Sequence, residues 1–381
     1  MKIKTVHSIA VCLVAFALSF LMTSCGNDDD ASQGGGNDAK LYIKIATIDN
    51  TLAKAGEKDL LDNEKMHSVR IIVLHENGTV EHNRYYSLDG AQEYVPYVIL
   101  PVTASEKKTV YVFANEESVG EVEGVTGNMS LTKFFDSYIK GTNGFKDNIN
   151  NIYYTPDYSD GKNIAMSCEP KEVEIGASGT VKETFYVVRV ATKFTVNFKN
   201  LRPDAVKVEN FSIKEYADKN FLMAHVGSYP QSDTYSTWVD WLRAVSDASS
   251  VDASYAQTDA AGWLTEYDLP AAAAINNVYT YNTPINVTAP SNGITFGTPD
   301  ATPVFYLPES KSKCDEQKIQ HYTLTVKIDG VTNPFECELP NLKSLFRNTH
   351  VVIDVTCKSN GITTEIFVRP WNVIEHEQIV L

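Results

Sequence analysis

Alternation of apolar and polar residues dominates the chain from Leu41 onward. It is regular over 41–48, and 69–75 is a run rich in Val and Ile. Short segments of this kind are typical of strands with a buried face. The Asn77-Gly78 pair after the second run favours a tight hairpin turn. Further strands are predicted at 94–100, 109–113, 172–175, 185–198, 206–213, 322–328, 335–339, 351–357 and 364–368.

Two stretches depart from the strand pattern. Residues 131–140 and 235–247 are predicted to form short helices, and the second places Trp238 and Trp241 at helical spacing with apolar neighbours. We interpret the two tryptophans as packing residues, although an aromatic pair can also serve as a platform for sugars. Residues 246–261, rich in Asp, Ala and Ser, are predicted to form a surface loop.

Many short strands with few helices predict an all-β fold of antiparallel β-sandwiches with short helical insertions. About 340 residues follow position 39, more than one hydrophobic core usually organises, so two tandem domains are expected. The small residues at 176–179 precede the long predicted strand at 185–198. We therefore assign an N-terminal sandwich to 40–180 and a C-terminal sandwich to 181–381.

The first residues have the three parts of an export signal. Basic Lys2 and Lys4 precede an apolar stretch over 9–22, and the small residues Thr23 and Ser24 lead into Cys25. This order predicts a signal peptide at 1–24 that ends in a lipobox, with lipid attached to Cys25. The apolar stretch is shorter than the roughly 20 residues that cross a bilayer, which disfavours a spanning anchor. A cleaved signal with an unmodified cysteine is the other alternative.

Residues 25–39 are predicted to form a solvated tether, because they contain no large apolar side chain. The acidic triplet at 28–30 is either a solvated run or an export signal, since it resembles the acidic segment that follows the lipid cysteine in many surface lipoproteins of gut and oral anaerobes. The expected location is the outer face of the outer membrane.

The chain is acidic, with 33 basic and 48 acidic residues. Removal of the signal peptide takes away Lys2 and Lys4, which leaves 31 basic residues and a net charge of −17. Such a chain is repelled by phosphate backbones, so nucleic acid is excluded as an expected partner.

Four cysteines follow Cys25, at Cys168, Cys314, Cys337 and Cys357. They form no CxxC pair and no cluster with histidine, so a thiolate metal site is not predicted. Cys337 and Cys357 each share a strand face with apolar residues, and they are either small buried hydrophobes or a disulfide pair.

The sequence contains no recognised catalytic pattern. His75 and His82 lie on a predicted hairpin rather than four residues apart on a helix, and no second histidine follows His376. A GxSxG elbow and a phosphate-binding glycine loop are also absent from the sequence. We interpret 157–163 as a turn rather than a calcium loop. We therefore expect no catalytic site, cofactor or metal, and no enzymatic activity.

Six short segments resemble the fimbrillin family, the lipoprotein-derived type V pilin subunits of anaerobic Gram-negative bacteria. They occur in family order across the mature chain. The segments are 69–78 (VRIIVLHENG), 108–116 (KTVYVFANE), 188–196 (VRVATKFTV), 305–309 (FYLPE), 346–350 (FRNTH) and 368–371 (VRPW).

The resemblance implies two transthyretin-like sandwiches and a structural or adhesive subunit of a cell-surface fimbria, with other fimbrial subunits as partners. In this family a protease cuts after the first strand, typically behind an arginine, and the vacated groove accepts a strand from a neighbouring subunit. Leu41, Ile43 and Ile45 would then be the inward residues of the removable strand. The alternative is a permanent first strand. The tail at 372–381, with Ile374, Ile379 and Leu381, would be donated or would complete the sheet.

The connection after the first strand departs from the family pattern. It contains no arginine between Leu41 and Val69; Lys54, Lys58 and Lys65 are the basic residues there, and Arg70 lies within the next predicted strand. Either another protease cuts this chain, or the chain keeps its lipid and first strand as an anchor subunit. Anchor and stalk both remain open, and a tip role is less favoured. A different class of function is a stand-alone surface lipoprotein that binds glycan or host protein.

Overall fold

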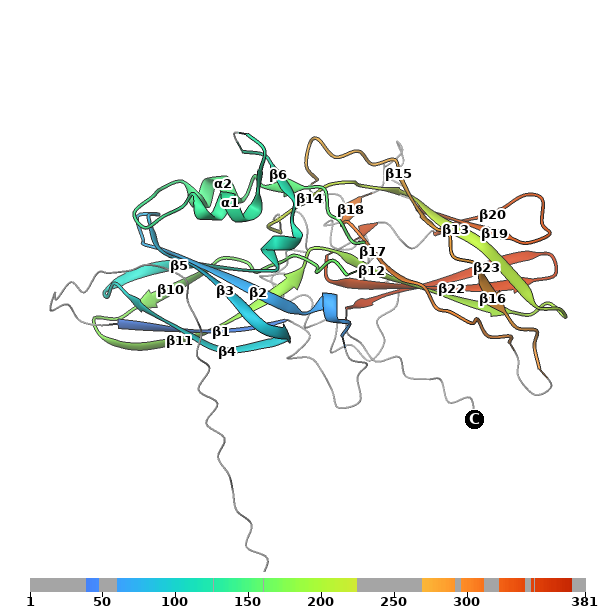
Figure 1. The fold of residues 1–381 in the computed structure, drawn as a ribbon, viewed down its shortest axis with the longest axis horizontal. Coiled ribbons are helices and arrows are strands. Elements are labelled where there is room, and N and C mark those ends of the chain that lie inside the picture. Colours follow the sequence, from blue (N-terminus) through green and yellow to red (C-terminus); the bar gives the residue numbers. More distant parts are fainter. Residues whose placement is uncertain are drawn as a thin grey trace, which may run out of the picture. The chain divides into compact units, whose positions relative to one another are not determined.

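The structure is a computed structural model that describes residues 39–47, 60–125, 127–159, 161–224, 269–291, 296–311, 322–339, 344–345 and 347–371. Strands dominate these ranges, which confirms the all-β prediction (Figure 1). Cys25, Trp238, Trp241, Cys314 and the tail at 372–381 lie outside the described residues. None of the described helices has the length and hydrophobicity needed to cross a bilayer.

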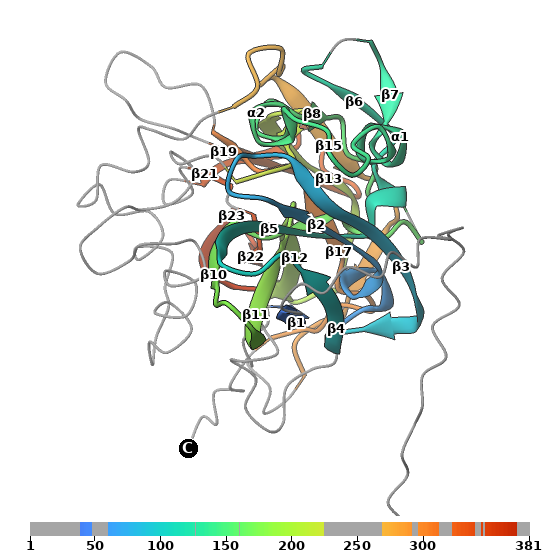
Figure 2. The ribbon, with the colours of Figure 1, turned by 90° about the vertical axis from the view of Figure 1, so that its left-hand side faces the viewer.

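The N-terminal sandwich is a single path of paired strands that curls around one core. Its order is β3 (Val80–Gln92), β2 (Met66–Leu74), β5 (Glu106–Ala114), β9 (Met166–Ser167), β11 (Gly179–Arg189), β1 (Ala39–Thr47) and β4 (Tyr94–Val102), and β10 (Lys171–Ile175) pairs with β5. Inward side chains from both ends of this path share one hydrophobic cluster. The first strand of the described chain therefore lies inside a sheet rather than at its edge (Figure 2).

Two short helices cover the outer face of β2 and β5 (Figure 1). Helices α1 (Leu131–Asp136) and α2 (Phe145–Ile149) pack their aromatic residues onto Tyr111 and Phe113 of β5. The Ser130 hydroxyl caps α1 by accepting a hydrogen bond from the Lys133 amide at 3.3 Å. A small sheet borders the helices, formed by β14 (Asn220–Phe221), β8 (Tyr153–Tyr154), β6 (Glu121–Glu123) and β7 (Met129–Ser130). The helix predicted at 131–140 is confirmed, although it ends at Asp136.

The C-terminal sandwich consists of two packed sheets. One has the order β17 (Val304–Leu307), β12 (Thr192–Asn200), β22 (Thr349–Lys358) and β23 (Gly361–Pro370). The other has the order β15 (Asn277–Tyr281), β13 (Val206–Tyr216), β19 (Tyr322–Ile328) and β20 (Phe335–Leu339), with β16 (Ile285–Val287) paired to β13. The two sheets enclose a separate core that contains Phe194, Phe211 and Phe305. A two-stranded pair, β18 (Ser310–Lys311) and β21 (Ser344–Leu345), completes the described strands.

The long strand predicted at 185–198 is two strands, and this part of the prediction was wrong. β11 ends at Arg189 and pairs with β1, whereas β12 begins at Thr192 and pairs with β22. Val190 and Ala191 link them, held by hydrogen bonds from the Val190 amide to the Ala165 carbonyl and from the Asn348 amide to the Ala191 carbonyl. Both linking residues are small, apolar and buried, so the pattern shows no break. The chain passes between the sandwiches here, about ten residues after the predicted boundary at 180/181.

Two other local predictions have clear outcomes. The Asn77-Gly78 turn is confirmed, because the Gly78 amide donates to the His75 carbonyl at 2.9 Å and Gly78 has a φ of +84°. β3 follows this turn as the second strand of the predicted hairpin, but its extent was not predicted. Most of its residues are exposed or half-buried, so it lacks the apolar alternation that marks the other strands.

The described cysteines Cys168, Cys337 and Cys357 are free thiols. Cys337 lies on β20 and Cys357 on β22, in different sheets, so the disulfide considered from the sequence is absent. Burial raises the pKa of Cys357 to about 11 and that of Cys168 to about 12. Cys357 therefore acts as a small buried hydrophobe, while Cys337 is half-buried.

Candidate strand-exchange site

β1 is paired along both of its edges. It runs parallel to β11 from the pair Ala39–Gly179 to the pair Thr47–Val187. On its other side it runs antiparallel to β4, from Ala39 opposite Val102 to Ala46 opposite Tyr94, with one bulge. Without β1, the facing edges of β4 and β11 would both expose unpaired backbone amides and carbonyls, which is the property of a strand-accepting groove.

The inward face of β1 belongs to the core. Leu41, Ile43 and Ile45 are 0% exposed and share the hydrophobic cluster with residues of β2, β4, β5, β10 and β11. The structure thus places the three predicted residues on the side that a replacement strand would have to fill. Burial of an aliphatic side chain contributes about 1.5–3 kcal/mol, so the three together contribute roughly 5–9 kcal/mol.

The outward face of β1 is held by aromatic and cationic contacts. The Tyr42 ring meets the Tyr97 ring edge to face, with centroids 6.0 Å apart. The Lys44 ammonium lies 4.8 Å from the centre of the Tyr94 ring, and the Lys182 ammonium lies over the Tyr42 ring. These contacts join β1 to the same two neighbours, β4 and β11, as its backbone does.

Arg70, the first arginine after β1, is buried on β2. Its guanidinium forms a two-point ion pair with Glu116, with both N–O distances at 2.6 Å, and lies 3.0 Å from the Asp136 carboxylate of α1. Burial alone would lower the pKa of Arg70, but the hydrogen bonds and charge of Glu116 raise it above its ordinary value. Arg70 therefore ties α1 to the sheet and is not presented to a protease.

Asn115, from the family-like segment 108–116, fixes the chain just before β2. It adopts a left-handed conformation with φ of 58° and is 1% exposed. Its side chain accepts a hydrogen bond from the His67 amide at 2.7 Å and donates to the carbonyls of Lys65 and Ile164 at 2.9 and 2.8 Å. The segment that follows the connection from β1 is thereby anchored independently of β1.

The segments 305–309 and 346–350 meet in a buried ion pair between the sandwiches. The Arg347 guanidinium donates to both carboxylate oxygens of Glu309, at 2.7 and 2.6 Å. It also donates to the carbonyls of Phe221 and Leu222, at 2.8 and 3.0 Å. Because Phe221 belongs to the small sheet of the N-terminal half, this pair stabilises the junction.

Arg189 and Trp371, from two further family-like segments, surround Glu64. The Arg189 guanidinium donates to the Glu64 carbonyl at 2.7 Å and lies 5.1 Å from the Trp371 ring centre. The Glu64 carboxylate accepts a hydrogen bond from the Tyr306 hydroxyl at 2.8 Å and pairs with the Lys193 ammonium at 2.7 Å. Burial raises the pKa of Glu64, but the charges of Lys193 and Arg189 outweigh it and hold that pKa below its ordinary value.

Glu64 was not singled out from the sequence. It lies in the short 3-10 helix Asp62–Glu64 and is 0% exposed, although its neighbours Asp62 and Lys65 are ordinary surface residues. No local pattern distinguishes it from them. The family-like segments supply most of the partners of Glu64. Their residues therefore build the junction between the two sandwiches rather than line the groove between β4 and β11.

A second buried cation lies inside the N-terminal sandwich. His75, Glu81 and Glu106 bring ligand atoms within 4.8 Å of one another, a spacing that suits a metal ion. The fully buried Lys108 ammonium already lies among them, 2.5 Å from Glu81, 3.2 Å from His75 and in contact with Glu106. A metal would have to displace this ammonium, so the cluster is a structural ion-pair network. The alternation of buried and exposed positions along β5 could have identified Lys108 as a buried residue, because Lys108 shares a strand face with Val110 and Val112.

The other predicted site residues cannot be placed. Cys25 and the tail residues Ile374, Ile379 and Leu381 lie outside the described residues. The last described residue, Trp371, is 2% exposed and stacks on Tyr306 with ring centroids 5.6 Å apart. The described chain therefore ends at the junction between the sandwiches.

Comparisons with known proteins give matches among solved structures. No family model and no curated protein matches the sequence. The tip fimbrial protein Mfa3 from Porphyromonas gingivalis is 11% identical, with a TM-score of 0.48 over 88% of this chain and 100% of that one. A fimbrial assembly protein from Parabacteroides distasonis is 9% identical, with a TM-score of 0.43 over 86% of this chain and 98% of that one. Both are named as fimbrial proteins.

Proposed function

We propose that this protein is a non-enzymatic structural or adhesive subunit of a cell-surface fimbria, assembled with other subunits by strand exchange. Lipid on Cys25 would deliver it to the outer membrane. The observation that carries the proposal is the position of β1. It is the first described strand, it lies inside a sheet, and it supplies three fully buried aliphatic residues to the core. Its removal would leave a groove that another strand can fill.

The contacts after β1 support this proposal. Asn115 and Glu64 anchor the chain between Glu64 and His67, and neither bonds to β1. A cut in the connection at 48–59 would therefore separate β1 from a frame that is held by its own hydrogen bonds. Such a frame can keep its shape while the groove is empty.

The groove sets requirements for its occupant. An incoming strand has to run parallel to β11 and antiparallel to β4, and it has to present apolar residues at alternate positions. In an extended tail, Ile379 and Leu381 would share one face, whereas Ile374 would take the opposite face. Val373 lies on the same face as Ile379 and Leu381, so the tail at 372–381 offers three inward aliphatic residues, as many as the three that β1 supplies.

The absence of arginine from the connection favours an anchor role over a stalk role. In that case the chain would keep both its lipid and β1 at the base of a fimbria. The groove would then remain filled, and the subunit would take part in assembly as a donor or through its other surfaces.

Mass spectrometry of surface-sheared material tests the proposal. An anchor is expected as a diacylated species that starts at Cys25 and is found with other fimbrial subunits. A stalk subunit is expected to start between residues 49 and 67 and to form ladders that resist SDS. Recovery of the chain solely as a lipidated monomer, free of other subunits, would contradict the proposal and favour a stand-alone surface lipoprotein.

Deletion of residues 374–381 separates the two possible uses of the tail. Loss of the ladders, with the lipidated monomer still exported, is expected if the tail is donated to a neighbour. Ladders of unchanged length would exclude the tail as the donor strand.

A further inference from the structure

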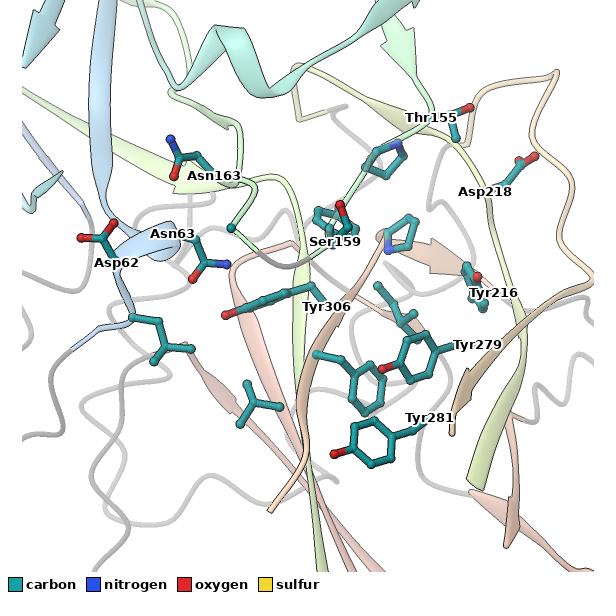
Figure 3. A pocket seen from close by; sticks show the side chains of 18 residues that line it. Asp62, Asn63, Thr155, Ser159, Asn163, Tyr216, Asp218, Tyr279, Tyr281 and Tyr306 are labelled. Carbon is teal, nitrogen blue, oxygen red and sulfur yellow. The ribbon is translucent and has the colours of Figure 1, made fainter. Parts of the chain in front are cut away.

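An open cavity of about 840 Å³ lies where segments of both sandwiches meet (Figure 3). Its lining comes from residues 61–63, from 155–159 and 161–163, from the end of β13 with Asp218, from β15, and from β17 with the residue that follows it. The volume falls within the roughly 300–1,000 Å³ typical of small-molecule sites. None of its lining residues belongs to β1, β4 or β11, so the cavity is separate from the strand groove.

One wall of the cavity is aromatic and rigid. Tyr279 and Tyr281 are alternate residues of β15 and therefore face the same side. The Tyr279 ring stacks on Phe305 with centroids 4.1 Å apart, and the Tyr281 ring stacks on Phe211 at 5.2 Å. Rings that are already fixed lose little conformational freedom when a ligand packs against them.

Tyr306 extends this wall and is fixed by Trp371 and Glu64. Figure 3 shows the hydroxyls of Tyr279, Tyr281 and Tyr306 pointing in a common direction. Because the Tyr306 hydroxyl already donates to Glu64, the wall combines flat apolar faces with the hydroxyls of Tyr279 and Tyr281 as groups that suit a polar ligand.

The rest of the lining includes neutral polar side chains, beside apolar residues and two carboxylates. Asn63 and Asn163 line the cavity, together with the exposed hydroxyl residues Thr155 and Ser159 (Figure 3). An asparagine amide both donates and accepts, so it suits a ligand hydroxyl that does the same. The loop that carries Ser159 is shaped by a hydrogen bond from its amide to the Asp157 carboxylate at 3.0 Å.

The charges of the lining exclude one class of ligand. It contains the carboxylates of Asp62 and Asp218 and, among the described residues, no Lys, Arg or His. Phosphate, sulfate and sialic acid groups would meet like charge without a cationic partner. A ligand that matches rigid aromatic faces, amides and hydroxyls without carrying negative charge is an uncharged sugar.

We propose that this cavity binds a neutral saccharide unit, presented by a glycan on a host or bacterial surface. The sugar packs its C–H faces against the tyrosine wall and exchanges hydrogen bonds with Asn63, Asn163 and the hydroxyls of Tyr279 and Tyr281. A proline-rich peptide would use the aromatic faces but has few groups to pair with the amides and hydroxyls. The site does not depend on polymerisation, because one chain supplies all of its lining.

Binding of the purified mature chain to an array of neutral, sialylated and sulfated glycans tests the proposal. Neutral glycans are expected to bind, and the strongest is then titrated by calorimetry against variants. Ser159→Trp places a large side chain at an exposed position of the rim and should weaken binding at least about tenfold. Asn163→Ala should weaken it about three- to tenfold, the effect of one lost hydrogen bond.

Ser178→Trp is the matched control, because Ser178 is also an exposed loop serine but does not line the cavity. It should bind like the unaltered chain, and circular dichroism should show equal melting temperatures for all variants. The proposal is overturned if no neutral glycan binds above background, if only sialylated or sulfated glycans bind, or if a bound glycan is insensitive to both Ser159→Trp and Asn163→Ala. Displacement of the glycan by a proline decamer at similar affinity would assign the cavity to peptides instead.

Discussion

Replacement of Ile43 by alanine should weaken the N-terminal sandwich at β1 more than elsewhere. Ile43 is 0% exposed in the middle of β1 and belongs to the core cluster formed with residues of β2, β4, β5, β9, β10 and β11. Truncation of a buried isoleucine to alanine costs about 2–5 kcal/mol, because it removes apolar burial and leaves a cavity. Lys40→Ala is the matched control, since Lys40 is exposed on the same strand and its change should stay within about 0.5 kcal/mol.

Hydrogen–deuterium exchange with mass spectrometry localises this effect. Where exchange follows opening of the sandwich, about 2–5 kcal/mol corresponds to roughly 30- to 4,000-fold faster exchange. The increase is expected in peptides from β4 and β11, the two strands paired with β1. Peptides from β12 and β22, in the separate core of the C-terminal sandwich, should be unchanged.

Either of two results would refute the proposal that removal of β1 opens a groove between β4 and β11. If Ile43→Ala and Lys40→Ala leave the exchange of β4 and β11 equally protected, β1 does not contribute to the core as the structure has it. If β12 and β22 lose protection as much as β4 and β11 do, the two sandwiches unfold as one unit. Removal of β1 would then unfold the whole subunit instead of opening a groove.

Three further predictions concern buried polar groups. Glu309→Ala should lower the free energy of unfolding in urea by about 3–5 kcal/mol, because it leaves Arg347 buried without its carboxylate partner. Adding Arg347→Met should recover much of that loss. Equal stability of the single and double variants would contradict this. The pKa of Glu64 in the folded protein lies below its ordinary value of 4.5, so the ionised carboxylate contributes to folding stability above pH 4.5, and this contribution is lost as the pH falls through the lower folded pKa. The stability advantage of the unaltered chain over Glu64→Gln should therefore shrink in acid. A difference in stability that does not change with pH would argue against this. Cys168 and Cys357 should resist a thiol reagent at pH 8 until urea unfolds the chain, because burial keeps both thiols protonated. Peptide mapping of the labelled cysteines measures this. Rapid labelling of either cysteine in the folded protein would contradict its burial.

The family-like segments have a consistent structural meaning. Glu309 and Arg347 pair with each other, Arg189 bonds to Glu64, and Trp371 packs between Arg189 and Tyr306. All of these residues join elements that lie far apart in the sequence. A buried charged network of this kind holds the two sandwiches together with defined geometry.

The distribution of contacts also separates two properties of the molecule. The groove between β4 and β11 that β1 fills depends on backbone pairing and on burial of aliphatic side chains, and all of these contacts lie within the N-terminal sandwich. The aromatic cavity lies at the junction and uses tyrosines of the C-terminal sandwich. The proposed assembly and the proposed ligand binding should therefore respond to different changes, to Ile43→Ala in one case and to Ser159→Trp in the other.

The local pattern of apolar and polar residues was sufficient to predict most strands and the first helix. A residue's neighbours at i±2 decide whether a short segment can bury one face, so β1, β2, β4, β5, β13, β19 and β22 were predictable from alternation. The same reasoning identified Leu41, Ile43 and Ile45 as one face of a strand. It failed at Val190 and Ala191, where the chain changes sandwich without any polar residue or glycine. It also did not delimit β3, the second strand of the predicted hairpin, because the exposed surface of β3 carries no apolar stripe.

Tertiary structure alone decided what these elements do together. Alternation shows that β1 has a buried face, but only the pairing with β11, whose residues lie about 140 positions later in the chain, places β1 inside the sheet. Burial of Glu64 and convergence of Tyr279, Tyr281 and Tyr306 on one cavity likewise depend on contacts between distant segments. Sequence pattern reports the local period of burial, whereas strand order and the meeting of distant side chains follow from how the whole chain minimises exposed apolar surface and unpaired polar groups.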